Sequence, residues 1–204
     1  MERLWYVAYG SNLLLERFRC YLAGGRPVGG NRTYAGCRDG SDPRAIIATE
    51  IPGRLYFAGR SRMWGGGMAF YDARGTGLVA ARAYLITVAQ FSDVTAQEMR
   101  RPPGADLDVI GIGVDGYHTL GPGFYETVVG LGSREGLPMM AITAGERADH
   151  TRVPPSRSYL RTIVAGLREA HRWSPARIGA YLASAPGVAG GWTAEQIAEL
   201  ADEG

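Results

Sequence analysis

Strand-like segments fill the first two thirds of this chain, and helix-like segments dominate the final third. Short apolar runs rich in aromatic and β-branched residues indicate buried strands. On this basis we predict strands over residues 4–8, 53–58, 67–71 and 78–87, a short strand at 45–48, and a hairpin joining 124–131 to 137–143. Strands followed by helices predict an α+β fold, in which helices cover a mostly β core.

Helical spacing and capping residues predict the helices. Ser11 is expected to cap a helix that runs to Tyr21, and a second helix is expected over 88–99, ended by Pro102 and Pro103. In the final third, the expected caps and helices are Ser156 before 159–171, Ser174-Pro175 before 176–183, and Thr193 before a short tail helix.

Two stretches show little periodicity and are rich in Gly, Arg or Pro. We expect residues 24–52, apart from the short strand, and residues 102–123 to be irregular insertions. The 204 residues suit a single domain, 1–204, whose helical C-terminal extension covers about 174–204.

The charges are nearly balanced, with 22 basic and 20 acidic side chains. Because the basic residues are scattered along the chain, no nucleic-acid partner is expected. All 22 are Arg, so lysine chemistry such as a Schiff base or a phosphate-binding P-loop is excluded. The Arg-, Gly- and Ala-rich composition is typical of a GC-rich genome, as in actinobacteria.

Cysteine and histidine positions give no sign of a metal site. Cys20 and Cys37 are spaced for neither zinc nor a redox pair, and His118, His150 and His171 are scattered. A reduced, cytoplasmic setting is the simplest interpretation. We see neither a signal peptide nor an apolar run of about 20 residues, so no membrane partner is expected.

The turn Tyr9-Gly10-Ser11-Asn12 is the most informative local feature. It follows a buried strand, and Gly10 lets the backbone turn sharply and approach a ligand closely. The N–H groups at the start of the next helix have no helical acceptor, so they favour a carboxylate or an oxyanion. A plain capped helix is the commoner outcome of such a pattern, and both interpretations stay open on physical grounds. Ser11 lies in no Gly-x-Ser-x-Gly elbow, so a cap is favoured over a nucleophile.

Several segments together resemble the γ-glutamylcyclotransferase-like family. Tyr-Val-Ala-Tyr-Gly-Ser-Asn-Leu at 6–13 is very similar to the opening signature of that family. In the same order as in the family follow Trp64-Gly65-Gly66-Gly67-Met68-Ala69-Phe70, Ala83-Tyr84-Leu85-Ile86-Thr87, and a closing helix that begins Pro155-Ser156-Arg157-Ser158-Tyr159-Leu160 and continues to His171. The resemblance spans most of the chain and implies a small mixed or antiparallel β-barrel core surrounded by helices.

The resemblance also implies a reaction and a catalytic residue. Family members cyclise a γ-glutamyl group: its α-amine attacks its own γ-carbonyl, releasing 5-oxoproline and a free amine without any cofactor. The family carboxylate lies on the helix after the long strand, and Glu98 occupies the matching place, although Met99 stands where a glycine is usual. Position alone would favour a solvated Glu98 near a helix end, whereas the resemblance favours a general acid and base.

The same resemblance assigns the substrate-binding residues. The opening turn, made of Tyr9, Gly10, Ser11, Asn12 and Leu13, is expected to hold the substrate carboxylate or the developing oxyanion. Tyr159 in the closing helix and, less closely matched, Tyr125 are expected to line the pocket.

The expected partner is a small molecule with a glutamyl or similar amide, and the protein is expected to be a monomer or a homodimer. Two other hypotheses stay open. The first is a repurposed member that acts on a specialised metabolite by another acyl or proton transfer, since one family branch removes a γ-glutamyl protecting group in antibiotic biosynthesis. The second is a non-catalytic glutamyl-binding module.

Overall fold

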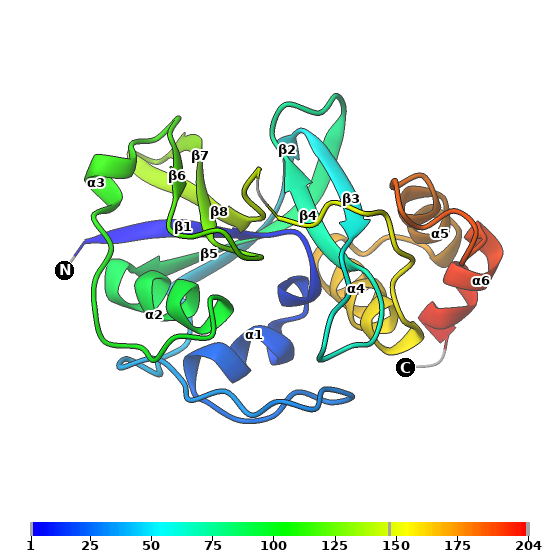
Figure 1. The fold of residues 1–204 in the computed structure, drawn as a ribbon, viewed down its shortest axis with the longest axis horizontal. Helices are drawn as coiled ribbons and strands as arrows, with labels where there is room; N and C mark the ends of the chain where they lie inside the picture. The colour runs from blue at the N-terminus through cyan, green and yellow to red at the C-terminus, as the bar shows by residue number, and fades with distance from the viewer. Residues whose placement is uncertain (1, 147, 203–204) are drawn as a thin grey trace.

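The computed structural model describes residues 2–146 and 148–202, and a six-stranded sheet lies at its centre (Figure 1). The strand order is β2-β5-β1-β8-β7-β6. β1 pairs in parallel with β8, and the other neighbours are antiparallel. A two-stranded sheet packs beside it. The strands are β1 (Arg3–Ala8), β2 (Ala45–Pro52), β3 (Arg54–Ala58), β4 (Met68–Asp72), β5 (Leu78–Thr87), β6 (Tyr117–Thr119), β7 (Thr127–Arg134) and β8 (Leu137–Thr143).

Strand β1 is buried on both faces of the main sheet. Because side chains alternate along a strand, Trp5 and Val7 join one hydrophobic core, while Leu4 and Tyr6 join another. This explains why the predicted strand at 4–8 is a continuous apolar run rather than an alternating one.

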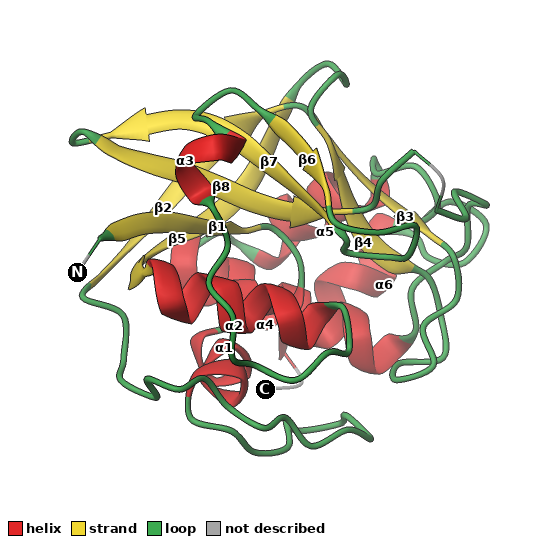
Figure 2. Cartoon of the chain, turned by 60° about the vertical axis from the view of Figure 1, so that its left-hand side comes forward, coloured by secondary structure: helices red, strands yellow, loops and turns green. Residues whose placement is uncertain are grey.

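Helices cover the two faces of the sheet and extend to one side of it (Figures 1 and 2). One core includes residues of α1 and α2, and the other includes residues of α4, α5 and α6. The helical elements are η1 (Ser11–Leu13), α1 (Leu15–Leu22), α2 (Val88–Glu98), α3 (Val109–Ile112), α4 (Arg157–His171), α5 (Pro175–Ala183), α6 (Ala194–Glu199) and η2 (Leu200–Asp202).

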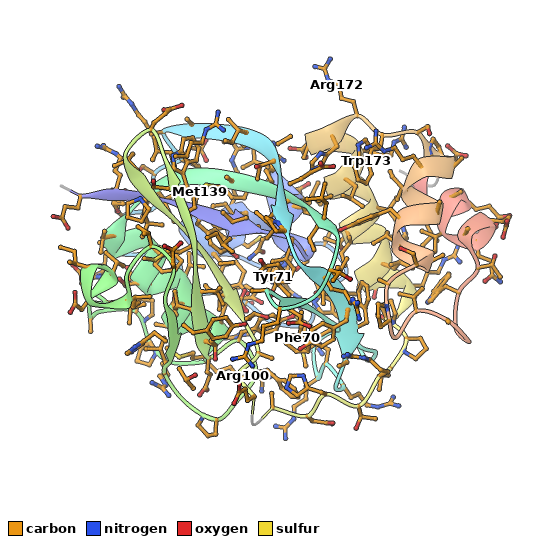
Figure 3. All side chains as sticks on the ribbon, turned by 90° about the horizontal axis from the view of Figure 1, so that it is seen from above. Phe70, Tyr71, Arg100, Met139, Arg172 and Trp173 are labelled. Carbon is orange, nitrogen blue, oxygen red and sulfur yellow. The ribbon has the colours of Figure 1, made fainter. Side chains whose placement is uncertain are left out.

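The caps predicted for the C-terminal helices are confirmed. Ser156, Ser174 and Thr193 each accept a hydrogen bond from a backbone N–H in the first turn of the helix that follows. Helix α4 ends at Arg172, which has a left-handed φ of 54° and projects from the surface (Figure 3).

The prediction that Ser11 caps a long helix is wrong. Ser11–Leu13 forms a 3-10 turn without any side-chain cap, and Leu14 is extended (ψ 120°), so α1 begins only at Leu15. The reason is tertiary. Leu13 packs against Gly166 of α4, which holds the turn apart from the axis of α1.

Three other boundaries also differ from the prediction. β2 extends to Pro52 because its full length pairs with β5. β7 begins only at Thr127, after Tyr125 has adopted a left-handed φ of 53°. The stretch expected to be irregular at 102–123 contains α3 and β6, a strand that pairs with β7 and is itself exposed.

The α+β class with a mixed, mostly antiparallel sheet is confirmed. The paired strands form two separate sheets, and Thr143 of β8 links these sheets. Its hydroxyl accepts from the N–H of Tyr71 at 3.0 Å and donates to the carbonyl of Tyr71 at 2.7 Å. This link places the β3–β4 hairpin at the end of β1, where the chain turns.

Gly166 offers a test of the contact between α4 and η1. A Cβ at this position would lie 2.5 Å from Leu13 Cβ and 2.6 Å from the Leu14 nitrogen. Helix propensity alone favours Ala over Gly by about 1 kcal/mol. We expect the steric cost of the added methyl group to outweigh this gain in helix propensity. Gly166→Ala should therefore lower the free energy of unfolding by about 1–3 kcal/mol in urea denaturation. Ala170→Gly on the same helix is the control and should cost about 1 kcal/mol through propensity. A stabilised Gly166→Ala would contradict the close contact.

Candidate active site

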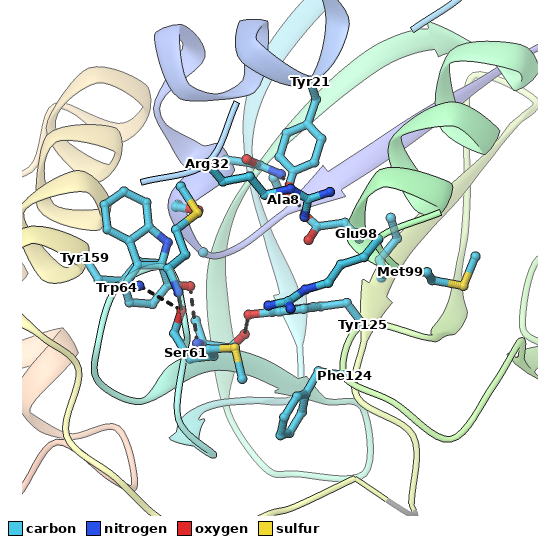
Figure 4. A pocket seen from close by; sticks show the side chains of 18 of the residues that line it. Ala8, Tyr21, Arg32, Ser61, Trp64, Glu98, Met99, Phe124, Tyr125 and Tyr159 are labelled. Carbon is cyan, nitrogen blue, oxygen red and sulfur yellow. Dashed lines mark hydrogen bonds between the residues drawn. The ribbon is translucent and has the colours of Figure 1, made fainter. Parts of the chain in front are cut away.

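A cavity of about 420 Å³ lies where β1 ends, close to the last turn of α2 (Figure 4). This volume is in the usual range for small-molecule sites. Its wall comes from segments far apart in the sequence: residues 8–12 after β1, Arg17 and Tyr21 of α1, Arg32 and Tyr34, the connection between β3 and β4, residues 98–100, residues 123–126, and Tyr159 of α4.

Glu98 is the last residue of α2, and its partly buried side chain faces this cavity. Burial raises the pKa of Glu98 above its usual value, while a hydrogen bond from Tyr21 and the charges of Arg17 and Arg32 oppose the shift. The C-terminal end of a helix carries a partial negative charge, which also disfavours a carboxylate. Such a group keeps its proton to a higher pH than an exposed Glu does, which suits a proton carrier.

Asn12 joins the turn after β1 to Glu98. Its side-chain amide donates to the Tyr6 hydroxyl at 3.0 Å and lies 3.5 Å from a carboxylate oxygen of Glu98. The Tyr84 hydroxyl of β5 donates to the Asn12 carbonyl at 2.7 Å. Asn12 Oδ1 is buried without a hydrogen-bond partner. Asn12 is therefore fixed by the sheet and presents an unused acceptor at the site.

The turn offers backbone donors to the cavity. The carbonyls of Gly10 and Ser11 accept from Leu13 and Leu14, whereas the N–H groups of residues 10–12 donate to no backbone carbonyl in the part of the chain that the structure describes. The backbone of Gly10 lies close to Tyr159, since a Cβ at Gly10 would be 3.3 Å from the Tyr159 hydroxyl. This geometry is consistent with the expected carboxylate or oxyanion cradle.

Two residues of the expected cradle have other roles. The Tyr9 hydroxyl donates to the Ile142 carbonyl at 2.6 Å, which ties the end of β1 to β8 while Tyr9 still borders the cavity. Leu13 is fully buried in the core and is not part of the cavity wall.

Tyr125 and Tyr159 both hydrogen-bond the backbone of Ala69. The Tyr125 hydroxyl donates to the Ala69 carbonyl at 2.8 Å, and the Tyr159 hydroxyl accepts from the Ala69 N–H at 3.3 Å. Burial raises the pKa of both phenols, so they are neutral hydrogen-bonding groups. The structure thus brings Glu98, Gly10, Ser11, Asn12, Tyr125 and Tyr159 to one cavity.

Sequence reasoning missed Arg17. Its guanidinium carbon lies 4.7 and 4.6 Å from the ring centroids of Tyr21 and Tyr34, and one nitrogen donates to the Tyr34 hydroxyl at 2.7 Å. The spacing of Arg17 and Tyr21, one helical turn apart, was a signal that an arginine lies on the buried face.

The segment that carries Arg32 and Tyr34 is held against α2 by buried polar side chains. The Gln97 side chain accepts from the Gly36 N–H at 3.2 Å and donates to the Tyr21 carbonyl at 3.1 Å. Asp93, fully buried, pairs with Arg38 at 3.0 Å. The irregular insertion therefore forms one side of the cavity wall.

The histidines lie outside the cavity wall. His150 bonds the Tyr56 hydroxyl at 2.9 Å, His171 bonds the Ala81 carbonyl at 3.0 Å, and His118 is exposed on β6. Within residues 2–146 and 148–202, no three His, Cys, Asp or Glu side chains gather as metal ligands would. Among the same residues, no helix is long and apolar enough to cross a membrane.

Comparison with solved structures identifies the fold. A protein titled gamma-glutamyl cyclotransferase superposes with a TM-score of 0.55 at 18% identity, over all of both chains. An uncharacterized protein from Homo sapiens superposes with a TM-score of 0.54 at 19% identity, over 99% of each chain. The chain has the γ-glutamylcyclotransferase fold. The fold expected from the resemblance is thereby confirmed.

Comparison by sequence finds a relative whose name differs from those of the solved structures. No protein-family model matches the chain. A histone deacetylase 5 from Arabidopsis thaliana is 31% identical over 198 residues, which cover 88% of this chain and 30% of that protein. The chain therefore spans less than a third of that relative. We therefore interpret the cavity from the γ-glutamylcyclotransferase fold.

The environment of Glu98 predicts a pH-dependent stability. Its pKa is raised in the folded state, so the unfolded state loses this proton first as pH rises from about 4.5. Stability contributed by the protonated carboxyl is present below that pH and is lost as pH rises through the folded-state pKa. We expect Glu98→Gln to raise Tm relative to wild type at pH 7 and to lose this advantage below pH 4.5. A Tm difference that does not change with pH would contradict a raised pKa.

Proposed function

We propose that this protein is a γ-glutamylcyclotransferase that releases 5-oxoproline and a free amine from a γ-glutamyl compound. The observation that carries the proposal is one cavity in which Glu98, a carboxyl with a raised pKa, lies beside the turn at residues 10–12. The N–H groups of this turn have no backbone acceptor among the described residues. The fold shared with a gamma-glutamyl cyclotransferase supports it.

The chemistry needs only a bound substrate and one proton carrier. Counted from the neutral α-amine, a bond forms between the amine nitrogen and the γ-carbonyl carbon, and the bond from that carbon to the leaving nitrogen breaks. One proton moves from the attacking nitrogen to the leaving nitrogen, and no water is consumed. In this proposal Glu98 accepts that proton and then donates it, which is the role that a carboxyl of raised pKa can serve in both directions.

The remaining groups hold the substrate. The N–H groups of residues 10–12 bind the glutamyl carboxylate or the oxygen that becomes negative in the tetrahedral intermediate. Asn12 positions Glu98 through its amide, and its unused Oδ1 can accept from the attacking amine. Tyr125 and Tyr159 hold the backbone of Ala69 and shape the wall next to Gly10.

The direct test is Glu98→Gln, assayed with γ-glutamyl dipeptides, γ-glutamyl amines and glutathione, with 5-oxoproline detected by mass spectrometry. We expect kcat to fall at least 100-fold, because general acid–base catalysis typically contributes a factor of 10²–10⁴. Glu146→Gln is the control, since Glu146 is exposed, lies outside the cavity wall and pairs with the exposed Arg74. It should keep wild-type turnover.

Three outcomes separate the hypotheses. Full activity of the Glu98→Gln variant would contradict the proposed mechanism. Tight binding of γ-glutamyl dipeptides by the wild-type protein in calorimetry, without any 5-oxoproline, would favour a binding module. A product other than 5-oxoproline would favour a repurposed acyl or proton transfer.

A further inference from the structure

Arginine side chains dominate the charge of the cavity wall. Five of them border the cavity, against two carboxylates: Arg17, Arg32, Arg60, Arg62 and Arg100 against Glu98 and Glu126. Glu126 also pairs with Arg101 at 3.8 Å, so less of its negative charge is available to balance the five cavity arginines. None of the five cavity arginines forms an ion pair with an acidic side chain in the part of the chain that the structure describes.

Arg17 is the strongest sign that an anion binds here. Its side chain is buried, with 4% exposure, and its Nε and Nη1 atoms have no hydrogen-bond partner among the residues that the structure describes. Its hydrogen bonds and ring contacts are with neutral groups, the hydroxyls and rings of Tyr21 and Tyr34, and Glu98 attracts it without forming an ion pair. A buried charge without a paired counter-ion is costly, so such a group is typical of a site that receives one from a ligand. Arg17 borders a second cavity of about 280 Å³ as well as the cavity that Glu98 faces.

The other arginines continue the basic wall outward from Glu98. Arg32 is partly buried, and Figure 4 shows it beside Glu98 and Tyr21. Arg32, Arg62 and Arg100 also line an adjoining hollow of about 290 Å³ together with Asn31 and Met63. Arg100 follows Glu98 by two residues and has a left-handed φ of 59°, so the chain reverses there and keeps the arginine at the mouth of the cavity.

The basic wall exceeds what one glutamyl group requires. The proposed function assigns the turn at residues 10–12 to the glutamyl carboxylate or to the developing oxyanion. Even if one arginine binds the glutamyl carboxylate, the others from Arg32 to Arg100 face the part of the substrate that leaves. Guanidinium groups bind carboxylates through paired, charge-assisted hydrogen bonds.

We infer that the leaving amine is acidic: an amino acid or short peptide that carries two or more carboxylates, bound by the arginines at the cavity mouth. The inference rests on the proposed function, which it deepens by naming the substrate class. A γ-glutamyl group linked to glutamate or to an acidic peptide fits this description, whereas a neutral or cationic leaving amine offers the arginines no additional carboxylate.

The test compares two substrates of nearly the same shape, γ-glutamyl-glutamate and γ-glutamyl-glutamine, which differ by one carboxylate. We expect kcat/KM to be at least tenfold higher for γ-glutamyl-glutamate in 50 mM salt, mostly through KM, because a hydrogen bond to a charged group contributes about this much binding. The preference should shrink in 500 mM salt, because salt screens charges at the exposed mouth.

Single variants locate the effect. Arg62→Gln and Arg100→Gln should each lower the preference for γ-glutamyl-glutamate over γ-glutamyl-glutamine at least threefold, because kcat/KM falls more for the substrate with the additional carboxylate. Arg172→Gln is the matched control. It removes one exposed positive charge far from Arg100, as Figure 3 shows, and should leave the preference unchanged. Equal loss in all three variants would show a general charge effect and overturn the inference.

A binding experiment tests the inference independently of turnover. The Glu98→Gln protein is titrated calorimetrically with the same two dipeptides. At least tenfold tighter binding of γ-glutamyl-glutamate supports an acid-selective cavity, even if the wild-type protein forms no 5-oxoproline and the proposed function fails. Equal affinities, or an equal kcat/KM for the two dipeptides, overturn the inference and leave the proposed function standing.

Discussion

Burial of β1 on both faces of the main sheet is the constraint on which the rest of the structure depends. The strand lies between β5 and β8 and contributes alternate side chains to two cores. Its end is held further by the Tyr9 hydroxyl on β8. The turn at residues 10–12 is therefore anchored to the most rigid part of the molecule, and its N–H groups are fixed in space before any ligand arrives. Such preorganised donors stabilise developing charge without reorganising.

Electrostatic opposition in one cavity sets the behaviour of Glu98. Burial and the end of α2 favour its neutral form, while Arg17 and Arg32 favour its ionised form. Burial outweighs the opposing charges, so the pKa of the carboxyl is raised. In the function proposed above, the same two arginines contribute to the positive charge that would bind an anionic substrate. Proton transfer and substrate selection would then depend on the same charges.

The excursion that follows α1 is a working part of the site, because buried polar groups hold it in place. Gln97 and Asp93 of α2 bind the segment around Gly36 and Arg38, and Tyr34 closes over Arg17. Polar groups buried in this way are satisfied only in one arrangement, which fixes an otherwise irregular segment. Glu98 sits one residue beyond Gln97, so the same helix turn anchors the excursion and presents the carboxylate.

The sequence by itself determined the elements whose local pattern and burial agree. The continuous apolar run gave β1, and the residues Ser156, Ser174 and Thr193 gave the starts of three helices, because capping is a local hydrogen bond. The motif at 6–13 and its companions pointed to the fold and to the carboxylate at Glu98. Tertiary structure alone decided that Ser11 caps no helix and that Leu13 turns into the core against Gly166. It also decided that Arg17 is buried with two nitrogens that have no hydrogen-bond partner in the described part of the chain. Those outcomes depend on packing between residues distant in the chain. No local pattern reports such packing, because the energy of a buried charge or a close contact is set by partners that the neighbouring sequence does not contain.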